Sequence, residues 1–511
     1  MILPEDCIKE ILEHLAEDKK SLYKCLFANR LFCKCVVPIL WRDPWSEYFS
    51  RESFWTRDPW SEYFSRTNYW TILGKTIIKC FPREIKQSLS KKIFLNPSLL
   101  QQPLFIYVSY IQSISESAID TLNENVFEDY GRRYFQLLKD EFWSLFMKQC
   151  FKIKFLCLPT MNLFKYPGSR NFLSSLSTLE CYPNTSPAIF IELSKNVHTL
   201  KRLVISVNHH NLKYIETLIL SQKNLEELSF SSYKYPFPFR TFRKIIYGSG
   251  KYPILFKNQN TIGRLSQSLR VLEFYRQICL PSQNISSFIN LTELSINYSS
   301  APPLNEENDK ILEHVSLPKL EILTLKNVNR NNLDIYAKLI DNTRNSLKVI
   351  DIYFNEDNPM LSLESIEYYL NVIKTKCPDI EILPIWLIPE IPLSILECLL
   401  ESCSKVKKII IYILNSNSLL DTVLAKPILY LLALKSSMML NDIRLIGRWS
   451  FSNLDIQEFF ELWKGMKRTP LKFKFDNNIF SQYIIKICEF YHRQGIINRG
   501  IINYTTPYKY C

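Results

Sequence analysis

Apolar residues recur along most of this chain in one short pattern, apolar-x-x-apolar-x-apolar, which begins near residue 150. Leu200, Leu203 and Ile205 form one copy, and Leu320, Leu323 and Leu325 form another. The alternation at the end of each copy predicts a short strand with one buried face. We expect such strands in copies that start at residues 153, 176, 200, 225, 269, 291, 320, 347, 380, 406 and 440.

Helical spacing occupies the stretches between these strands, as at Ile366, Leu370 and Ile373. Successive starts lie 22 to 34 residues apart, except for one interval of 44 that could hide a degenerate unit of 22. A strand followed by a helix at this period resembles an irregular leucine-rich repeat, whose units bury their apolar faces only by stacking. The resemblance implies an α/β solenoid with parallel strands on the concave face and helices on the convex face. Another α/β or helical array is the alternative.

The first forty residues carry a different, helical pattern. Pro4 is suited to the start of a helix, and Glu5 and Asp6 lie in the first turn, where the helix dipole favours acidic groups. One helical face then holds Ile8, Ile11, Leu12 and Leu15, and after a polar turn a second stripe holds Leu22, Cys25 and Leu26. Three short helices of this length cannot bury their apolar faces among themselves, so we expect the unit to need a partner, either another chain or the rest of this one.

These residues, together with Leu3-Pro4, Asn29-Arg30 and Pro38-x-Leu40-Trp41, resemble an F-box. F-box modules dock on the Skp-type adaptor of Skp–cullin–F-box ubiquitin ligases. With the repeats, the resemblance is to F-box proteins with C-terminal leucine-rich repeats, a class expanded in fungi. It implies an adaptor-binding site in which much of the contact comes from Leu3, Pro4, Ile8, Ile11, Leu12 and Leu15, with Leu22, Leu26 and Arg30 behind them. Phe27-Ala28 departs from the family's usual Leu-Val-like pair, and an ordinary helical cap on the following domain is the alternative.

A tandem duplication of 15 residues follows the module. Residues 42–56 and 57–71 are identical over their first ten positions, and each copy begins with Arg, Asp and Pro. Trp45, Tyr48 and Phe49 would share a helical face, as would Trp60, Tyr63 and Phe64. We interpret the segment as a hydrophobic bracket between the module and the larger domain, with an aromatic recognition pocket as the alternative.

Residues between the apolar strand positions would point outward on the concave face of a solenoid. Tyr, Trp and Arg are frequent among the residues that dominate binding energy, so this surface is the predicted substrate-binding site. Its members are Glu227, Ser229, Glu273, Tyr275, Glu293, Asn297, Thr324, Lys326, Asp351, Tyr353, Trp386, Tyr412 and Arg444. Plain solvent exposure is the alternative for each of them taken singly.

The composition mainly indicates which classes of enzyme and site are not expected. Only 10 of the 511 residues are glycine, and no phosphate-cradling loop, nucleophile elbow, zincin or kinase motif is present. The 14 cysteines and 6 histidines lack metal-ligand spacing, so we expect no metal, no cofactor and buried free thiols in a reducing compartment. No signal peptide or membrane span is expected.

The net charge of +13 is unevenly distributed along the chain. Residues 1–71 hold 10 basic and 11 acidic residues, which leaves 53 against 39, or +14, for the remainder. Short groups such as Lys405, Lys407 and Lys408 resemble solvated faces of single elements, so nucleic-acid binding is not expected, although the excess keeps it open as a hypothesis.

The expected organisation is an F-box module (1–41), the duplicated insert (42–71), a helical linker (72–139), the solenoid (140–500) and a tail (501–511). The expected function is non-catalytic: a subunit in the cytoplasm or nucleus that binds a Skp-type adaptor, through it a cullin, and an unknown protein substrate. A ligase-independent repeat scaffold is the alternative function.

Overall fold

The computed structural model describes most of the chain in two compact units, one ending at Leu225 and the other beginning at Glu226. No described helix is both long and apolar enough to cross a bilayer. The described residues are 3–45, 59–92, 96–126, 134–158, 161–181, 185–206, 212–231, 259–275, 278–298, 309–354, 361–388, 390–413, 421–447, 449, 452–476 and 482–498.

The first unit begins with a three-helix module made of α1 (Glu5–Glu13), α2 (Lys19–Cys25) and α3 (Arg30–Leu40). The Asp18 side chain accepts a hydrogen bond from the Ser21 N–H at the start of α2, and Asn29 accepts one from Phe32 at the start of α3. Such caps satisfy donors that have no partner within the helix. The three helices enclose a small core of Ile8, Leu12, Leu22, Cys35, Val36 and Ile39. The module thus buries part of its apolar surface by itself.

A helical segment follows the module. The second copy of the duplication begins the long helix α5 (Pro59–Lys79), as the Asp-Pro pair predicts, whereas residues 46–58, including Tyr48 and Phe49, lie outside the described part. Trp45 supports the bracket interpretation, because its indole N–H donates to the Ser113 carbonyl over 2.7 Å and its ring contacts Phe146. The other elements here are α6 (Arg83–Lys92), the 3-10 helices η1 (Pro97–Leu100) and η2 (Tyr107–Tyr110), α7 (Glu116–Val126) and α8 (Phe135–Gln149).

Four parallel strands complete the first unit, each paired with the next in chain order up to β4. They are β1 (Ser113–Ser115), β2 (Phe155–Cys157), β3 (Thr178–Cys181) and β4 (Arg202–Ser206), with η5 (Leu163–Lys165), α9 (Ser169–Leu173), α10 (Pro187–Asn196) and α11 (Leu212–Ser221). Strand β1 lies within the predicted helical linker, so strand pairing begins earlier than the apolar pattern indicated.

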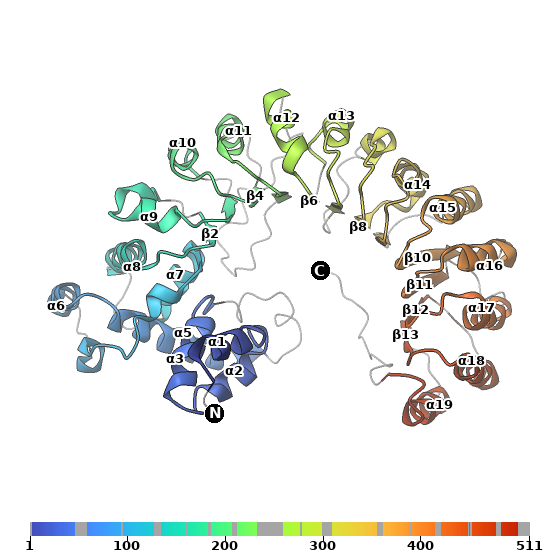
Figure 1. Cartoon of the computed structure of the whole chain (residues 1–511), viewed down its shortest axis with the longest axis horizontal. Coiled ribbons are helices and arrows are strands. Elements are labelled where there is room, and N and C mark those ends of the chain that lie inside the picture. Colours follow the sequence, from blue (N-terminus) through green and yellow to red (C-terminus); the bar gives the residue numbers. More distant parts are fainter. Residues whose placement is uncertain are drawn as a thin grey trace. The chain divides into compact units, whose positions relative to one another are not determined.

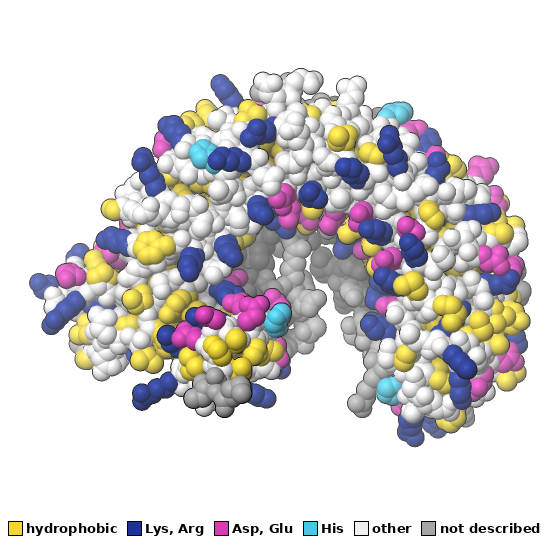
Figure 2. Space-filling model, in the orientation of Figure 1, with side chains coloured by type: hydrophobic (Ala, Val, Ile, Leu, Met, Phe, Trp, Pro, Cys, Tyr) yellow, Lys and Arg dark blue, Asp and Glu magenta, His cyan; other side chains and the backbone are white. Residues whose placement is uncertain are grey.

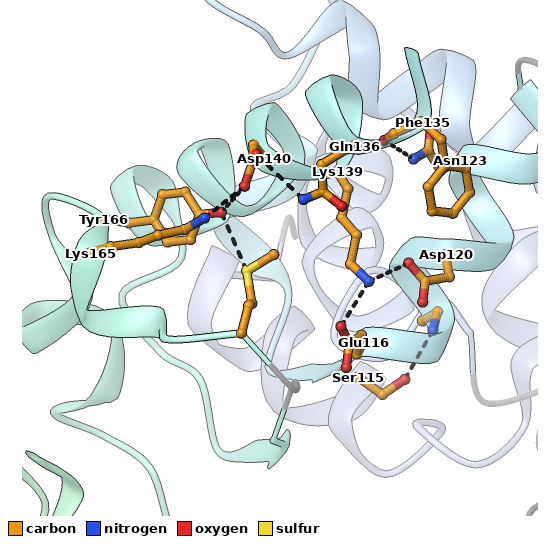
Figure 3. A network of polar contacts seen from close by, with 12 residues as sticks. Ser115, Glu116, Asp120, Asn123, Phe135, Gln136, Lys139, Asp140, Lys165 and Tyr166 are labelled. Atoms are coloured by element: carbon orange, nitrogen blue, oxygen red, sulfur yellow. Dashed lines mark hydrogen bonds and ion pairs between the residues drawn. The ribbon is translucent and has the colours of Figure 1, made fainter. Parts of the chain in front are cut away.

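A buried polar network joins α7 to α8 beside β1 (Figure 3). The Lys139 ammonium lies 2.7 Å from a carboxylate oxygen of Glu116 and 2.7 Å from one of Asp120. Burial lowers the pKa of Lys139, but its hydrogen bonds to Asp120 and Glu116 outweigh that effect, so its pKa is raised. The network therefore holds α7 and α8 together with a charged lysine in their interface.

The second unit repeats strand and helix nine times among the described residues, and all its paired strands are parallel. The strands are β5 (Glu227–Ser231), β6 (Val271–Tyr275), β7 (Glu293–Asn297), β8 (Ile322–Val328), β9 (Val349–Phe354), β10 (Ile382–Leu387), β11 (Lys408–Ile413), β12 (Asp442–Ile446) and β13 (Lys472–Asp476). The helices are α12 (Gln259–Ser268), α13 (Ser282–Ser286), η6 (Asp309–His314), η7 (Arg330–Asn332), α14 (Leu333–Asp341), α15 (Leu363–Lys376), α16 (Leu393–Ser402), α17 (Asp421–Lys435), α18 (Asn453–Gly465) and α19 (Gln482–Arg493).

Within this unit the strands lie on the inner side and the helices on the outer side (Figure 1). The apolar pattern forms the core, since Leu294, Leu323 and Ile350 are partners on successive strands and are fully buried. All eleven predicted strands are present, which confirms the α/β repeat fold, and β13 adds one more at the C-terminal end. The degenerate unit considered for the interval between 225 and 269 falls largely outside the described residues.

Ion pairs link successive repeats of the second unit. Lys348 pairs with Glu321, and Lys407 with Glu381, both at 2.8 Å. Lys405 pairs with Asp379 at the same distance. Each pair joins residues 26 or 27 positions apart, which is one repeat. Most of these side chains are about half exposed, so each pair contributes little alone.

Candidate interaction surfaces

The N-terminal module presents apolar side chains that its own core does not cover. Leu3 is 53% exposed and Ile11 is 51% exposed, and the thiol-bearing Cys7 between them is also exposed. Cys7 and Ile11 are four residues apart on α1 and therefore share one face of the helix, and Leu3 lies just before its N-cap Pro4. Figure 2 shows apolar side chains gathered on the part of the module that carries α1 and α2 in Figure 1, with acidic groups beside them.

The second helix of the module adds two large aromatic residues. Tyr23 is 60% exposed and Phe27 is 74% exposed, and their rings contact each other edge to face at 5.3 Å. Neither residue was among the predicted adaptor contacts, although their spacing of four residues at the end of a helix places them on one face. Large apolar side chains so exposed on a small helical module make this face a candidate docking surface.

The structure divides the predicted adaptor-binding residues into two groups. Leu3, Pro4, Ile11 and Arg30 are exposed, and Leu15 and Leu26 are half-buried. In contrast, Ile8, Leu12 and Leu22 form the core of the module and are at most 4% exposed. The predicted contact by Ile8 and Leu12 does not fit this structure, because α1 turns that side of its apolar stripe into the core of the module, whereas Leu22 was expected to lie behind the contact residues. The role of all three is to hold the docking face in shape.

Contacts near the end of α3 fix the module to the rest of the first unit. Arg42 donates two hydrogen bonds to the Glu13 carboxylate, one of them 2.7 Å long, and this pairing lowers the pKa of Glu13. The Trp41 ring lies 4.5 Å from that of Tyr107, and the Arg42 carbonyl accepts from the Gln112 N–H at 2.8 Å. The module is therefore held firmly against the start of the repeats.

The second candidate surface is the strand face of the second unit. Side chains that alternate with the core positions of β5 to β12 point to this face, as predicted for Glu227, Glu273, Tyr275, Glu293, Lys326, Asp351, Tyr353, Tyr412 and Arg444, all of which are exposed or half-buried. Asn297 and Thr324 are half-buried, and Asn297 accepts a hydrogen bond from Asn327. Ser229 lies on the same face but is buried, and its hydroxyl donates to Glu273 over 2.7 Å.

Trp386 does not have the predicted exposure. It is 1% exposed, because its ring contacts Phe354 at 4.7 Å and Tyr369 at 5.3 Å and stacks on Tyr412 at 5.6 Å. The ring is an interior support for the half-buried Tyr412 and cannot itself be a direct binding contact in this arrangement. Sequence alternation gives the face of a residue but not the packing of large rings along that face.

The charges of the strand face are separated along the unit. On β5 to β9 the described acidic side chains are Glu227, Glu273, Glu293 and Asp351, with Lys326 as the basic one. On β11 to β13 the basic residues of this face are Lys408, Arg444, Lys472 and Lys474, and the acidic residues are Asp442 and, at the end of β13, Asp476. Lys408, Lys472 and Lys474 were not predicted as site residues, although each alternates with a buried apolar residue in the sequence.

No protein-family model matches this chain, and no curated protein is similar to it in sequence. Among the described residues, no group of three or more His, Cys, Asp or Glu side chains could hold a metal ion. The exposed face of the module and the strand face of the second unit are the candidate binding surfaces of this chain.

Proposed function

We propose that this protein is the substrate-recognition subunit of a Skp–cullin–F-box ubiquitin ligase. The observation that carries the proposal is the module of α1 to α3, whose small core leaves Leu3, Ile11, Tyr23 and Phe27 exposed. A helical module with an uncovered apolar face, joined to a long array of repeats, suits a protein that binds one partner at each part. The resemblance to the F-box supports a Skp-type adaptor as the partner of the module.

The strand face of the second unit would hold the protein target in this scheme. Binding the adaptor and the target on one chain raises their effective concentration near the ubiquitin-carrying enzyme, and catalysis is by proximity. No side chain of this chain takes part in the chemistry, and no cofactor is required. The expected setting is the cytoplasm or nucleus, where the adaptor and cullin are found, with neither membrane nor nucleic acid involved.

Co-purification with a Skp-type adaptor tests the proposal. Leu3→Asp/Ile11→Asp places two charges on the docking face, and we expect adaptor affinity to fall by about 30-fold or more, since the loss of even one central apolar contact costs ~2 kcal/mol. Leu104→Asp changes a residue that is exposed elsewhere in the first unit and should leave binding intact. Retained adaptor binding by the double variant would contradict the proposal.

A ligase-independent repeat scaffold is the second candidate, and the anchoring of the module supports it. The Arg42–Glu13 pair and the Trp41–Tyr107 contact would also suit a helical cap that only protects the first repeats. On this alternative, the folded protein binds no adaptor, and Ile11→Asp has no binding consequence. Circular dichroism of the purified chain, measured beside the adaptor assay, separates a folded protein without adaptor binding from an unfolded one.

A further inference from the structure

Four basic side chains crowd the strand face at the C-terminal end of the second unit. The register pairs Arg444 with Lys474 on the neighbouring strand and places Asp442 between Lys408 and Lys472. Adjacent strands are only about 4.8 Å apart, so the cations of β11, β12 and β13 are close neighbours on one face. Like charges directly opposite each other on neighbouring strands lower stability.

Asp476 occupies this face at the end of β13, and Asp442 lies opposite Lys408 and Lys472 in the strand register. The Asp442 carboxylate lies 3.5 Å from the Arg444 Nε, and that Nε is buried without a hydrogen-bond partner among the described residues. Burial and the nearby Arg444 and Lys474 lower the pKa of Lys408, and together they outweigh Asp442 and Asp351, which raise it. The four basic residues of β11 to β13 outnumber the acidic residues Asp442 and Asp476, which leaves an excess of positive charge where solvent is partly excluded.

Other lysines of the second unit have acidic partners, in contrast to the excess of positive charge on the strand face of β11 to β13. Lys405 and Lys407 lie next to Lys408 in the sequence, but each makes an ion pair with an acidic residue of the preceding repeat at 2.8 Å. Lys435 pairs with two glutamates in the same way. The preceding repeats therefore supply acidic partners to these outer lysines, whereas the ion pair found among the described residues on the strand face of β11 to β13 is that of Arg444 with Asp442.

We infer that the strand face of β11 to β13 binds an acidic segment of a protein partner, with the carboxylates of the segment completing the charge balance of Lys408, Arg444 and Lys474. The Tyr412 ring, stacked on Trp386 beside this cluster, would pack against an apolar residue within the same segment. This inference names the chemistry of the target and rests on the proposed function only in assuming that the strand face is where the target binds.

A single-stranded nucleic acid is the other polyanion that basic and aromatic residues attract. The geometry favours the acidic protein segment for two reasons. The basic cluster spans three strands, or roughly 10 Å, which is short for a track of several phosphates. Further along the same face, Glu227, Glu273, Glu293 and Asp351 would repel a polyanion.

Fluorescence anisotropy with the full-length chain tests the inference on three labelled probes. The first is a seven-residue peptide of Asp and Glu with a central Phe, the second is its Asn and Gln counterpart, and the third is a ten-nucleotide oligothymidine. We expect the acidic peptide to bind at least tenfold more tightly than its amide counterpart and more tightly than the oligonucleotide. Arg444→Gln/Lys474→Gln should weaken the acidic peptide by about tenfold or more, since it removes two charge-assisted contacts.

The matched control is Lys310→Gln/Lys374→Gln, which removes the same charge from exposed positions of the second unit outside the strands. It should change peptide affinity less than twofold. Equal losses in both variants, or equal binding of the acidic and amide peptides, would overturn the inference in favour of unspecific attraction. Tighter oligonucleotide binding that Arg444→Gln/Lys474→Gln abolishes would overturn it in favour of a nucleic-acid site.

Two further measurements keep the result interpretable. Because it relieves like-charge repulsion, Arg444→Gln/Lys474→Gln should melt at the same or a higher temperature than the natural protein. Lys408→Gln is a second variant, with a single substitution, and it should also weaken binding of the acidic peptide. Adaptor co-purification by Arg444→Gln/Lys474→Gln should be unchanged. If peptide binding fails these tests while Leu3→Asp/Ile11→Asp still loses the adaptor, the inference falls and the proposed function stands. If the peptide tests succeed but Leu3→Asp/Ile11→Asp still binds the adaptor, the proposed function falls and the peptide site stands.

Discussion

Lys139 offers a sharp test of how the first unit is held together. Its ammonium group bridges the carboxylates of Glu116 and Asp120, and the side chains of Lys139 and Glu116 are each 11% exposed (Figure 3). Lys139→Met keeps most of the aliphatic volume but removes the cation. The change leaves two carboxylates close together between α7 and α8 without their counter-ion.

The expected cost is large for a single substitution. Removal of one partner from a buried ion pair costs about 3–5 kcal/mol, because the remaining charge stays buried and uncompensated. Asp120 is one-third exposed, which lets water screen part of its charge, so we expect the lower end of that range. A loss of ~3 kcal/mol means that the locally open state of α7 and α8 becomes roughly 100-fold more populated.

The free-energy penalty of Lys139→Met should also become smaller as the pH falls. Burial raises the pKa of Asp120, and Lys139 partly opposes that effect in the natural protein. Without Lys139 the pKa of Asp120 rises further, so the folded state binds protons more tightly than the unfolded state. Stability of the variant relative to the natural protein must then increase as the pH falls from 7 toward 4.

Hydrogen exchange of the α7 and α8 amides measures this local opening free energy at both pH values. Lys165→Met is the control in the neighbouring part of the network, where Lys165 and Asp140 are 47% and 39% exposed and pair at 2.9 Å. It should cost less than about 1 kcal/mol. The reasoning is refuted if Lys139→Met costs no more than the control, or if its penalty grows as the pH falls.

Two further predictions concern the second unit and the thiols. Trp386→Ala should lower the free energy of unfolding of the second unit by about 3–5 kcal/mol, as expected for a fully buried ring, and urea denaturation checks this; a change below 1 kcal/mol would mean that the ring is not buried. Iodoacetamide at pH 8 should label the exposed Cys7 and Cys398 well before Cys377 and Cys403, because burial raises the pKa of both latter thiols to about 12; mass spectrometry of the digested protein reads the order, and equal labelling would contradict it.

The apolar pattern predicted the repeats well, because a buried strand face requires apolar residues at fixed spacing. It missed β1 because Glu116 takes the place of the last apolar residue in a copy that would consist of Ile111, Ile114 and position 116. A buried glutamate there breaks the pattern, and its partner Lys139 is too distant in sequence to be recognised. It missed β13 for a simpler reason, since Pro470 takes the place of the leading apolar residue before Phe473 and Phe475.

The surfaces were less predictable than the core. Helical spacing placed Ile8, Ile11 and Leu12 on one stripe, but only packing decides that Ile11 faces solvent while the other two are enclosed. The excess charge of Lys408 and Lys474 was equally hidden, because ion pairing between repeats depends on which strands are neighbours. A sequence read one element at a time gives the face of each side chain but not its neighbours.

The charge separation along the strand face also bears on how fast a partner can bind. Acidic groups on β5 to β9 and basic groups on β11 to β13 give this face an electric dipole along the repeats. A partner with the reverse arrangement feels a torque before contact and reaches the face already turned, whereas an inverted one is repelled at both ends. Such steering acts on the association rate and weakens as salt is added, while short-range packing sets the lifetime of the complex.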